Sequence, residues 1–463
     1  MYTKSNLGDT IVAIATPPGV GALGVIRLSG PKAIEIADTA FFGKKLAEQA
    51  SHTIHLGTIR DEQGKVLDEV LASLFIGPRS YTRENVVEFS CHGSSFILQQ
   101  VLELLIRLGA RTAERGEFTL RAFLNGQMDL SQAEAVADLI ASDSAASHQL
   151  ALQQMRGGFS EEIQKLRDEL IQFASLIELE LDFGEEDVEF ADRDDLRQLV
   201  QKIQGLLKRL LDSFQLGNVM KHGVQTVIAG RPNAGKSTLL NRLLNEERAI
   251  VSDIAGTTRD TIEEVLNIQG VQFRLVDTAG IREAQDTIEA VGVEKTLEKI
   301  EQSALLVYVF DIIKTQPAEV QADLERLVKP GMAVLAVANK MDLNPYTKAE
   351  HYVSEALREE QFIPISAINN MNVEYLKDRL YETVIAGDLA ANDVIVSNTR
   401  HYEALRNAYE SLDAVLTGMA GGITSDFVAM DIRRALSHLG EITGEISTDD
   451  LLGNIFGKFC IGK

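Results

Sequence analysis

Cysteine, positive charge and long apolar runs are all scarce in this sequence of 463 residues. Only two cysteines occur, so neither a disulfide framework nor a cysteine-based zinc cluster is expected. No uninterrupted apolar run approaches the roughly 18 residues of a membrane-spanning helix, and no basic-then-apolar signal pattern opens the chain. We therefore expect a cytoplasmic protein that does not bind a membrane.

Lysine and arginine number 45 against 68 aspartate and glutamate residues, so the formal net charge is −23. The excess of acid is uneven. Residues 1–125 carry 13 basic and 13 acidic side chains, whereas the residues outside both this segment and 219–385 carry 14 and 30. A net charge this negative disfavours binding of nucleic acid through the overall electrostatic potential of the protein. Any such contact would depend on local sites or on a partner protein.

Three patterns of hydrophobic periodicity divide the chain. Residues 9–125 are rich in strand patterns, at 10–15, 24–28, 70–76 and 85–91, followed by a helix pattern at 95–108. Residues 223–385 alternate strands and helices as in a doubly wound sheet, with near-continuous apolar runs at 224–229, 273–277, 304–311 and 333–338. The rest is helical, which indicates one helical domain interrupted by an inserted α/β unit.

Local signals predict several helix ends in the helical part. Ser131 and Glu134 fit a capping box at the start of a helix, and Gly418 and Gly440 are predicted helix stops. The acidic run at 182–195 is interpreted as a solvated connection between helices rather than as a metal site.

Residues 230–237 read GRPNAGKS, directly after a predicted strand and before a predicted helix. This matches the phosphate-binding loop pattern G-x-x-x-x-G-K-[ST], in which backbone N–H groups surround a phosphate at the N-terminus of a helix. Lys236 would contact the β- and γ-phosphate oxygens, and Ser237 would bind Mg²⁺.

Further motifs follow in the order that a guanine-nucleotide site requires. The DTAG at 277–280 supplies an acid near Mg²⁺ and a glycine near the γ-phosphate, and the GTTRD at 256–260 is a switch segment. Residues 339–342 read NKMD. Asp342 can accept hydrogen bonds from the N1–H and the 2-amino group of guanine, two donors that adenine lacks. We therefore expect GTP rather than ATP. The predicted GTP-binding set comprises Asn233, Ala234, Gly235, Lys236, Ser237, Thr238, Ser252, Asp253, Ile254, Ala255, Gly256, Thr257, Thr258, Asp277, Thr278, Ala279, Gly280, Asn339, Lys340, Asp342, Ser366 and Ala367.

Ile281 stands where Ras-like GTPases carry the glutamine that positions the attacking water. An apolar side chain cannot orient water, so another group must complete hydrolysis. Asn233 is a neutral oxygen donor close to where an arginine finger would place its charge, so a monovalent cation held there is one candidate. The other candidates lie just downstream, at Arg282, Glu283, Asp286 and Glu289.

The chain resembles the MnmE (TrmE) family of bacterial tRNA-modification GTPases over essentially its whole length. The motifs that carry the resemblance are DTIVA at 9–13, ATPPG at 15–19, RGEF at 115–118, RAFLN at 121–125, the GRPNAGKS loop, the GTTRD switch and the terminal CIGK at 460–463. The resemblance implies a multidomain α+β and α/β fold. It places an α+β folate-binding and dimerisation domain at 1–125, helical parts at 126–218 and 386–463, and an inserted Ras-like doubly wound G domain at 219–385.

The resemblance also implies an activity. The family forms a homodimer whose GTPase is activated by K⁺. With the flavoprotein MnmG, in a heterotetramer or larger assembly, it adds a carboxymethylaminomethyl or aminomethyl group to C5 of the wobble uridine of certain tRNAs. The carbon comes from a tetrahydrofolate derivative, bound as the 5-formyl or methylene form.

Carried over to this sequence, the family's site residues fall into four groups. Ser237 and Thr258 would bind Mg²⁺, and Asn233 would bind K⁺ with Ser252, Ile254 and Thr257. Glu289 would orient the attacking water. The folate contacts map to Arg27, Glu88, Gln127 and Lys463, where Gln127 replaces a lysine common in relatives.

The two cysteines receive different interpretations. Cys460 stands where the family places a cysteine near the folate, and a chemical role and a packing role both remain open. Cys91 is predicted to lie in the core. Two other functions stay in view: a regulatory GTP switch without modification chemistry of its own, and a folate-dependent one-carbon enzyme with a vestigial G domain. The intact nucleotide motifs disfavour the second.

Overall fold

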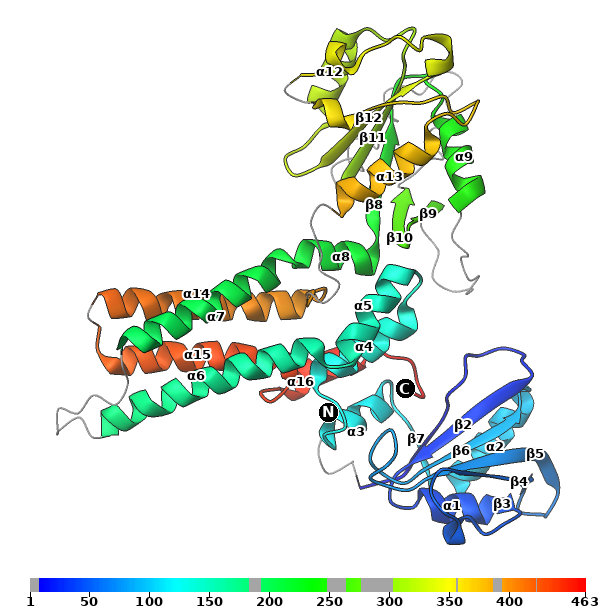
Figure 1. Ribbon diagram of the computed structural model, residues 1–463. Coiled ribbons are helices and arrows are strands. Elements are labelled where there is room, and N and C mark those ends of the chain that lie inside the picture. Colours follow the sequence, from blue (N-terminus) through cyan, green and yellow to red (C-terminus); the bar gives the residue numbers. More distant parts are fainter. Residues whose placement is uncertain are drawn as a thin grey trace. The chain divides into compact units, whose positions relative to one another are not determined.

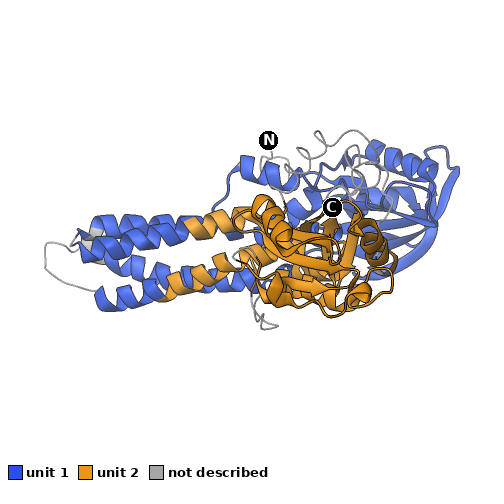
Figure 2. Ribbon diagram, turned by 90° about the horizontal axis from the view of Figure 1, so that it is seen from above, with its two compact units in different colours: residues 1–140, 154–201, 407–463 blue, residues 141–153, 202–406 orange. Residues whose placement is uncertain are grey.

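A computed structural model (Figure 1) describes residues 8–182, 193–247, 264–275, 303–354, 357–385, 394–421 and 423–463. The chain forms two compact units (Figure 2). The first comprises residues 1–140, 154–201 and 407–463, and the second comprises residues 141–153 and 202–406.

The first unit contains a seven-stranded sheet in the order β3-β4-β5-β6-β2-β1-β7. Its strands are β1 (Ile11–Ile14), β2 (Leu23–Ser29), β3 (Phe41–Phe42), β4 (Thr53–Arg60), β5 (Val66–Phe75), β6 (Val86–His92) and β7 (Arg111–Thr112). All neighbours are antiparallel except β1 and β7. The strands predicted from apolar runs are all present, whereas β3, β4 and β7 had not been predicted.

One face of this sheet is covered, and the opposite face is open along β4 and β5 but carries a smaller core at β1, made of Ile11, Ala13, Ala113 and Phe118. Helices α1 (Ala33–Ala40) and α2 (Ser95–Arg107) pack on the first face over a core that includes Ile26, Val87 and Phe89. Along β5 the residues alternate, so Val70, Ala72 and Leu74 are buried and Leu71 is exposed. The opposite face therefore presents side chains to solvent.

Helices make up the rest of the first unit. They are α3 (Glu117–Leu124), α4 (Leu130–Ala141), α6 (Gly158–Asp182), α15 (Ser425–Thr443) and α16 (Asp449–Phe456), with parts of α5 (Ala145–Met155), α7 (Arg193–Asp212) and α14 (Thr399–Ala420). Helices α6 and α15 lie side by side (Figure 1), and Arg167 of α6 forms an ion pair with Glu445, just after α15. Ten of the residues in the predicted acidic connection, 183–192, lie outside the described residues.

Three predicted helix ends are wrong. The capping box at the start of α4 is formed by Asp129 and Gln132: the Gln132 N–H donates to Asp129 Oδ1 and the Asp129 N–H donates to Gln132 Oε1, each at 2.9 Å. Ser131 is instead buried within the helix. Helix α14 continues past Gly418 to Ala420. Helix α15 continues past Gly440 and ends at Gly444, whose φ of 83° suits a glycine cap.

The second unit contains a six-stranded sheet in the order β13-β12-β11-β8-β10-β9. Its strands are β8 (Val224–Ala229), β9 (Glu264–Ile268), β10 (Val271–Leu275), β11 (Leu305–Asp311), β12 (Ala333–Asn339) and β13 (Phe362–Pro364). All neighbours are parallel except β9 and β10. The predicted buried strands are present, and the antiparallel β9 had not been predicted.

Helices cover both faces of the second sheet. They include α8 (Phe214–His222), α9 (Lys236–Glu247), α12 (Pro317–Leu327) and α13 (Val373–Val384). Leu239 of α9 and Leu376 of α13 share a core on one face, while Leu324 of α12 belongs to a separate core on the other. This is the doubly wound arrangement that the alternating pattern predicts.

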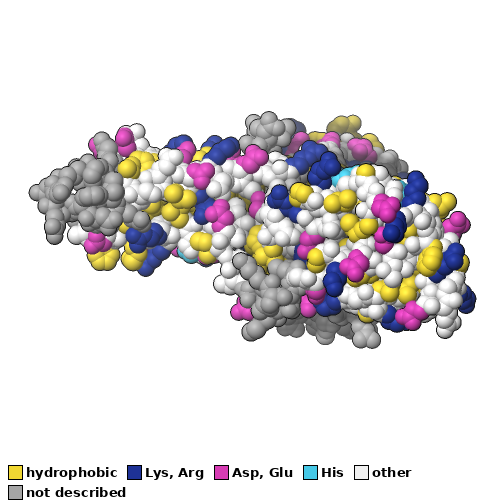
Figure 3. Space-filling model, turned by 90° about the horizontal axis from the view of Figure 1, so that it is seen from below, with side chains coloured by type: hydrophobic (Ala, Val, Ile, Leu, Met, Phe, Trp, Pro, Cys, Tyr) yellow, Lys and Arg dark blue, Asp and Glu magenta, His cyan; other side chains and the backbone are white. Residues whose placement is uncertain are grey.

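The surface carries charges of both signs. On the face in Figure 3, basic and acidic side chains are interspersed. Among the described residues, no helix combines the length and the apolar character that a membrane crossing requires.

Candidate nucleotide and folate sites

The phosphate-binding loop connects β8 to α9, and its conformation depends on two glycines. Gly230 has a φ of 149° and Gly235 a φ of 95°. A Cβ atom on Gly230 would collide with the Val309 carbonyl, and one on Gly235 would collide with the Asn339 side chain. The loop can therefore keep this curve only with glycine at both positions.

Lys236 is the first residue of α9 and points back along the loop. Its Nζ donates to the carbonyl oxygens of Gly230 at 2.7 Å and Arg231 at 2.9 Å. Burial lowers the pKa of Lys236, a shift that a nearby phosphate anion would oppose. The Ser237 hydroxyl is exposed and forms no hydrogen bond to a described residue, so it is available to a magnesium ion.

The NKMD segment forms hydrogen bonds to the phosphate-binding loop at Asn233 and Ala234. Asn339 Nδ2 donates to the Ala234 carbonyl at 2.8 Å, while its Oδ1 accepts from the Ala367 N–H at 3.0 Å. Lys340 Nζ donates to the Asn233 carbonyl at 3.0 Å and to Asp311 Oδ2 at 2.6 Å. The segments that would contact phosphate and base are thus bonded directly to each other.

Asp342 has an acceptor atom, unpaired within the described part of the chain, of the kind that guanine would satisfy. Its Oδ1 is buried and has no hydrogen-bond partner among the described residues. A buried acceptor without a donor is costly, and the N1–H and 2-amino group of guanine would supply donors. Adenine offers no such pair of donors.

Half of the predicted nucleotide set is brought together by these contacts. The structure gathers Asn233 to Thr238 of the loop with Asn339, Lys340, Asp342, Ser366 and Ala367. The predicted residues 252–258, 277–280 and Glu289 lie outside the described residues. That group includes the second predicted Mg²⁺ ligand, Thr258, and three of the four predicted K⁺ ligands.

Two arginines beside the nucleotide site had not been singled out. Arg231 Nε donates to Asp323 Oδ2 at 2.8 Å and also pairs with Glu319, both on α12. Arg242 of α9 donates to the carbonyl oxygens of Ala367 at 3.4 Å and Ile368 at 3.1 Å. Their partners lie 88 to 126 residues further along the chain, so no local sequence signal could have found them.

The predicted folate residues lie in the first unit, and two of them are on adjacent strands. Arg27 of β2 and Glu88 of β6 are register partners, and Arg27 Nε donates to Glu88 Oε1 at 2.7 Å. The Arg27 guanidinium lies 5.6 Å from the ring centres of both Tyr81 and Phe118. Gln127 and Tyr81 line one open cavity.

The C-terminal CIGK segment reaches the same sheet. Ile461 forms a β-bridge with Arg115, and Arg115 Nε donates to the Phe459 carbonyl at 3.0 Å. Gly462 has a φ of 95°, and a Cβ there would meet the Ile14 carbonyl of β1, the strand beside β2. The tail that carries Lys463 therefore lies against β1, which pairs with the strand that carries Arg27.

The cysteines differ in accessibility. Cys91 is buried in the sheet core, as predicted, and burial together with the negative charge of Asp68 raises its pKa to about 12. Cys460 is exposed. Of the two cysteines, only Cys460 is accessible from solvent.

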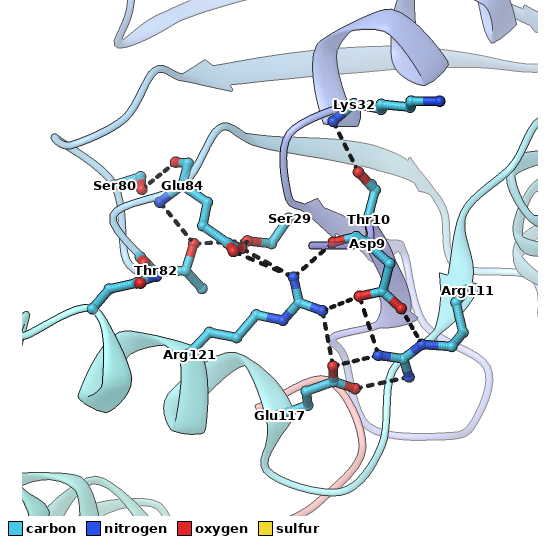
Figure 4. Close-up of polar contacts among 11 residues, drawn as sticks. Asp9, Thr10, Ser29, Lys32, Ser80, Thr82, Glu84, Arg111, Glu117 and Arg121 are labelled. Carbon is cyan, nitrogen blue, oxygen red and sulfur yellow. Dashed lines mark hydrogen bonds and ion pairs between the residues drawn. The ribbon is translucent and has the colours of Figure 1, made fainter. Parts of the chain in front are cut away.

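A buried arginine underlies the folate region (Figure 4). Arg121 is fully buried and pairs with Asp9 at 2.6 Å, Glu117 at 2.9 Å and Glu84 at 3.3 Å. Arg111 pairs with Asp9 at 2.5 Å and with Glu117 at 2.6 Å. Three of these five residues stand in the DTIVA, RGEF and RAFLN motifs, so much of the sequence signature encodes a structural ion-pair network.

Opposed effects set the pKa values in this network. Burial alone would raise the pKa of Asp9 and of Glu117. Hydrogen bonds from Arg111 and Arg121 outweigh burial, so both pKa values lie below their ordinary range. Both carboxylates are therefore charged at neutral pH.

The curved phosphate loop, the buried Asp342 acceptor and the mixed doubly wound sheet define a GTP-binding protein of the P-loop class. A family model described as "GTP-binding protein TrmE N-terminus" matches residues 10–127, and one described as "MnmE helical domain" matches residues 130–460. The chain belongs to the MnmE family of tRNA modification GTPases.

Full-length relatives agree with this assignment. The tRNA modification GTPase MnmE of Cytophaga hutchinsonii is 58% identical and covers 100% of this chain and 99% of its own. That of Christiangramia forsetii is 56% identical and covers 99% and 100%. A crystal structure of Aquifex aeolicus Era bound to GDP and aluminium fluoride is 27% identical over 41% of this chain and 66% of its own, with a TM-score of 0.27. That overlap is too small to carry an argument.

Proposed function

We propose that this chain is a K⁺-activated GTPase of the cytoplasm that modifies tRNA together with the flavoprotein MnmG. The pair adds an aminomethyl or carboxymethylaminomethyl group to C5 of the wobble uridine, with a carbon from methylene-tetrahydrofolate. The observation that carries this proposal is the full-length similarity to relatives named tRNA modification GTPase MnmE, at 58% and 56% identity. The segments 1–125, 126–218, 219–385 and 386–463 remain the proposed domains.

The nucleotide half of the proposal rests on the P-loop. Lys236 and the loop N–H groups bind the phosphates, Asp342 selects guanine, and Ser237 holds Mg²⁺ with Thr258. Mg²⁺ held by these residues would stabilise the negative charge on the phosphate oxygens during hydrolysis. Glu289 orients that water, since Ile281 cannot.

Asn233 is the proposed protein ligand of K⁺. Its φ of 61° turns the loop at this residue, and its carbonyl is already bonded to Lys340. The side-chain amide is exposed and has no hydrogen bond to a described residue, so its oxygen can coordinate a cation. Ser252, Ile254 and Thr257 would complete the site.

The folate half rests on the first unit. Arg27, Glu88, Gln127 and Lys463 are the proposed contacts of the tetrahydrofolate derivative, and the exposed Cys460 lies on the same tail as Lys463. The pairing of Arg27 with Glu88 and the approach of the tail to β1 support a single site.

The open face of the first sheet supports a homodimer. Leu56 of β4 and Leu71 of β5 are cross-strand partners that are 64% and 43% exposed, and Ile54 beside them is 65% exposed. Adjacent exposed apolar side chains on a sheet are typical of an interface. A second copy of the chain is the proposed occupant.

Contact with tRNA depends on local sites or on MnmG, because the net charge of −23 opposes attraction of tRNA by the protein as a whole.

Mass spectrometry of tRNA nucleosides tests the proposal. A strain that lacks this protein should contain wobble uridines without the C5 group, and the natural gene should restore the group. A Glu289→Ala gene should fail to restore it although the variant still binds GTP. Unaltered wobble uridines in the deletion strain would contradict the function and favour a regulatory GTP switch.

A further inference from the structure

Arg231, the second residue of the phosphate-binding loop, is bonded through its side chain to helix α12. Its Nε donates to Asp323 Oδ2 at 2.8 Å and its Nη2 to Asp323 Oδ1 at 3.5 Å, while its Nη1 donates to Glu319 Oε1. Each nitrogen of the guanidinium therefore has a carboxylate partner. Because two carboxylates offset its single charge, Arg231 is poorly suited to bind a phosphate directly, and it can affect nucleotide binding through the position of the loop.

The two carboxylates are themselves held in place. Glu319 lies in the first turn of α12, where its Oε2 accepts from the Gln316 N–H at 2.8 Å. Asp323 lies four positions further on the same helix and accepts from the hydroxyl of Tyr308, a buried residue of β11. Burial raises the pKa of Asp323, but the hydrogen bonds from Arg231 and Tyr308 outweigh burial and leave this pKa below its ordinary range. Asp323 is therefore charged at neutral pH.

The main chain of Arg231 connects these ion pairs to the residues that meet the phosphates. Its carbonyl oxygen accepts from Lys236 Nζ at 2.9 Å and from the Ala234 N–H at 3.4 Å. Lys236 is the residue that contacts the β- and γ-phosphates in loops of this kind. The position of the Arg231 carbonyl thus decides where the Lys236 ammonium group lies.

The other hydrogen bonds that hold the loop reach its later residues. Asn339 binds the carbonyl of Ala234, and Lys340 binds that of Asn233. Neither of them contacts Arg231. The early part of the loop therefore depends on helix α12, through the Arg231 side chain, for a fixed position.

We propose that Arg231 is a positioning residue for phosphate binding, which it serves by fixing its own carbonyl, and with it Lys236, through the ion pairs to Asp323 and Glu319. This inference rests on the proposed contact of Lys236 with the phosphates. A loop that is already in place before the nucleotide arrives lowers the entropic cost of binding. Loss of either side of the Arg231–Asp323 pair should therefore weaken the same interaction.

Titration of the full-length protein with GDP and GMP tests this role. Arg231→Gln should weaken GDP binding about tenfold, as the loss of one charge-assisted contact implies. Binding of GMP, which lacks the β-phosphate, should stay unchanged. Asp323→Asn should weaken GDP binding to a similar extent, although Arg231 is its only partner in the loop. The double variant should be no weaker than Arg231→Gln alone, since both changes break one link.

Arg379→Gln is the matched control. Arg379 of α13 also pairs with a carboxylate, Glu382, at 2.6 Å and donates to the Glu360 carbonyl at 2.9 Å, but none of these groups belongs to the loop. Its loss should leave both affinities unchanged. The thermal unfolding midpoint of every variant should stay near that of the natural protein, because Arg231 and Glu319 are each 40% exposed and such pairs stabilise a fold little.

Four results would overturn the positioning role. They are unchanged GDP affinity in Arg231→Gln, equal losses for GDP and GMP, losses that add in the double variant, and an Asp323→Asn protein that binds GDP as well as the natural one. The last result would mean that Arg231 acts without α12. Natural protein that binds GDP no more tightly than GMP would instead overturn the contact of Lys236 with the β-phosphate.

Discussion

At the scale of single residues, Asn233 makes the K⁺ proposal testable. Asn233→Ala removes the side-chain oxygen but keeps the carbonyl bonded to Lys340. We expect hydrolysis in K⁺ to fall on the order of 100-fold, to the rate seen in Na⁺, because a positioned charge at the transferring phosphate is lost. Steady-state phosphate release in KCl and NaCl measures this.

Nucleotide binding separates that effect from damage to the loop. Affinity for GDP should change less than threefold in Asn233→Ala, since Lys236 and Asp342 are untouched. Equal rates of the natural protein in the two salts would rule out cation activation.

Arg121 is the residue whose loss should cost the most stability. Arg121→Met leaves Asp9, Glu84 and Glu117 without their shared cation, and removing one partner of a buried ion pair costs about 3–5 kcal/mol of unfolding free energy. Chemical denaturation at pH 7 measures the loss. Arg107→Met is the control, because Arg107 forms only a surface pair with Glu62 at 3.5 Å.

The effect of Arg121 should depend on pH in a defined direction. Asp9 and Glu117 have pKa values below their ordinary values of about 4. Their contribution to the stability of the natural protein is therefore fully present above about pH 4, and it is lost as the pH falls through the lowered pKa values. In Arg121→Met these carboxylates repel each other when charged, and protonation relieves the repulsion. The stability gap between the natural protein and the variant should therefore narrow from pH 7 to pH 4. A gap that widens would contradict the assigned pairing.

At the scale of elements, Arg242 couples helix α9 to the loop that reads guanine. Asn339 ties Ala234 to the Ala367 N–H, and Arg242 binds the Ala367 and Ile368 carbonyls. We expect Arg242→Ala to weaken GDP binding about tenfold, because the segment 366–367, the proposed contact to O6 of guanine, loses the hydrogen bonds that fix it to α9. Fluorescence titration of the full-length protein measures this.

A nucleotide analogue distinguishes positioning from general damage. The diphosphate of 2-aminopurine riboside lacks O6, so its affinity should be the same in Arg242→Ala and in the natural protein. Arg242→Lys, which keeps a donor, should recover part of the GDP affinity, and Arg326→Ala on α12 should change nothing. If both nucleotides lost affinity equally, Arg242 would be a stability residue only.

Strands formed by near-continuous apolar runs could be predicted from sequence, whereas strands in which apolar and polar residues alternate were missed. The strands β8, β11 and β12 are such near-continuous runs, and most of their residues are buried. In β4, by contrast, Ile54 and Leu56 face solvent. Their alternation with other residues therefore did not mark a buried face, and the strand was not predicted. The P-loop and NKMD were predictable because their chemistry fixes residue types at close spacing.

Interactions between distant segments explain most of what sequence missed. Ser131 was predicted as the cap of α4 because serine is a frequent cap, yet Asp129 and Gln132 form the capping box two residues earlier. Arg79 and Gln127 are 48 positions apart, and only the folded chain brings them to one cavity. Arg231 and its partners on α12 are also far apart in the sequence and meet only in the folded chain.

At the scale of the whole molecule, the proposed homodimer can be tested at the open face of the first sheet. Leu71→Arg places a charge among Leu56 and Ile54 on this face without touching the buried core. We expect a monomer by light scattering at concentrations where the natural protein is a dimer, because burying an unpaired guanidinium costs several kcal/mol. GTP affinity should stay unchanged, since the nucleotide site lies in the second unit.

GTP hydrolysis by the Leu71→Arg variant tests whether dimerisation through this face is needed for the activity. If K⁺-dependent hydrolysis requires two G domains to meet, the Leu71→Arg monomer should hydrolyse GTP slowly, with a specific rate that rises with protein concentration. Leu343→Arg is the control, because Leu343 is 67% exposed but lies in the second unit, so it should leave the dimer intact. A Leu71→Arg protein that remains a dimer would show that the interface lies elsewhere. A true monomer with full, concentration-independent K⁺ activation would show that the G domains act singly.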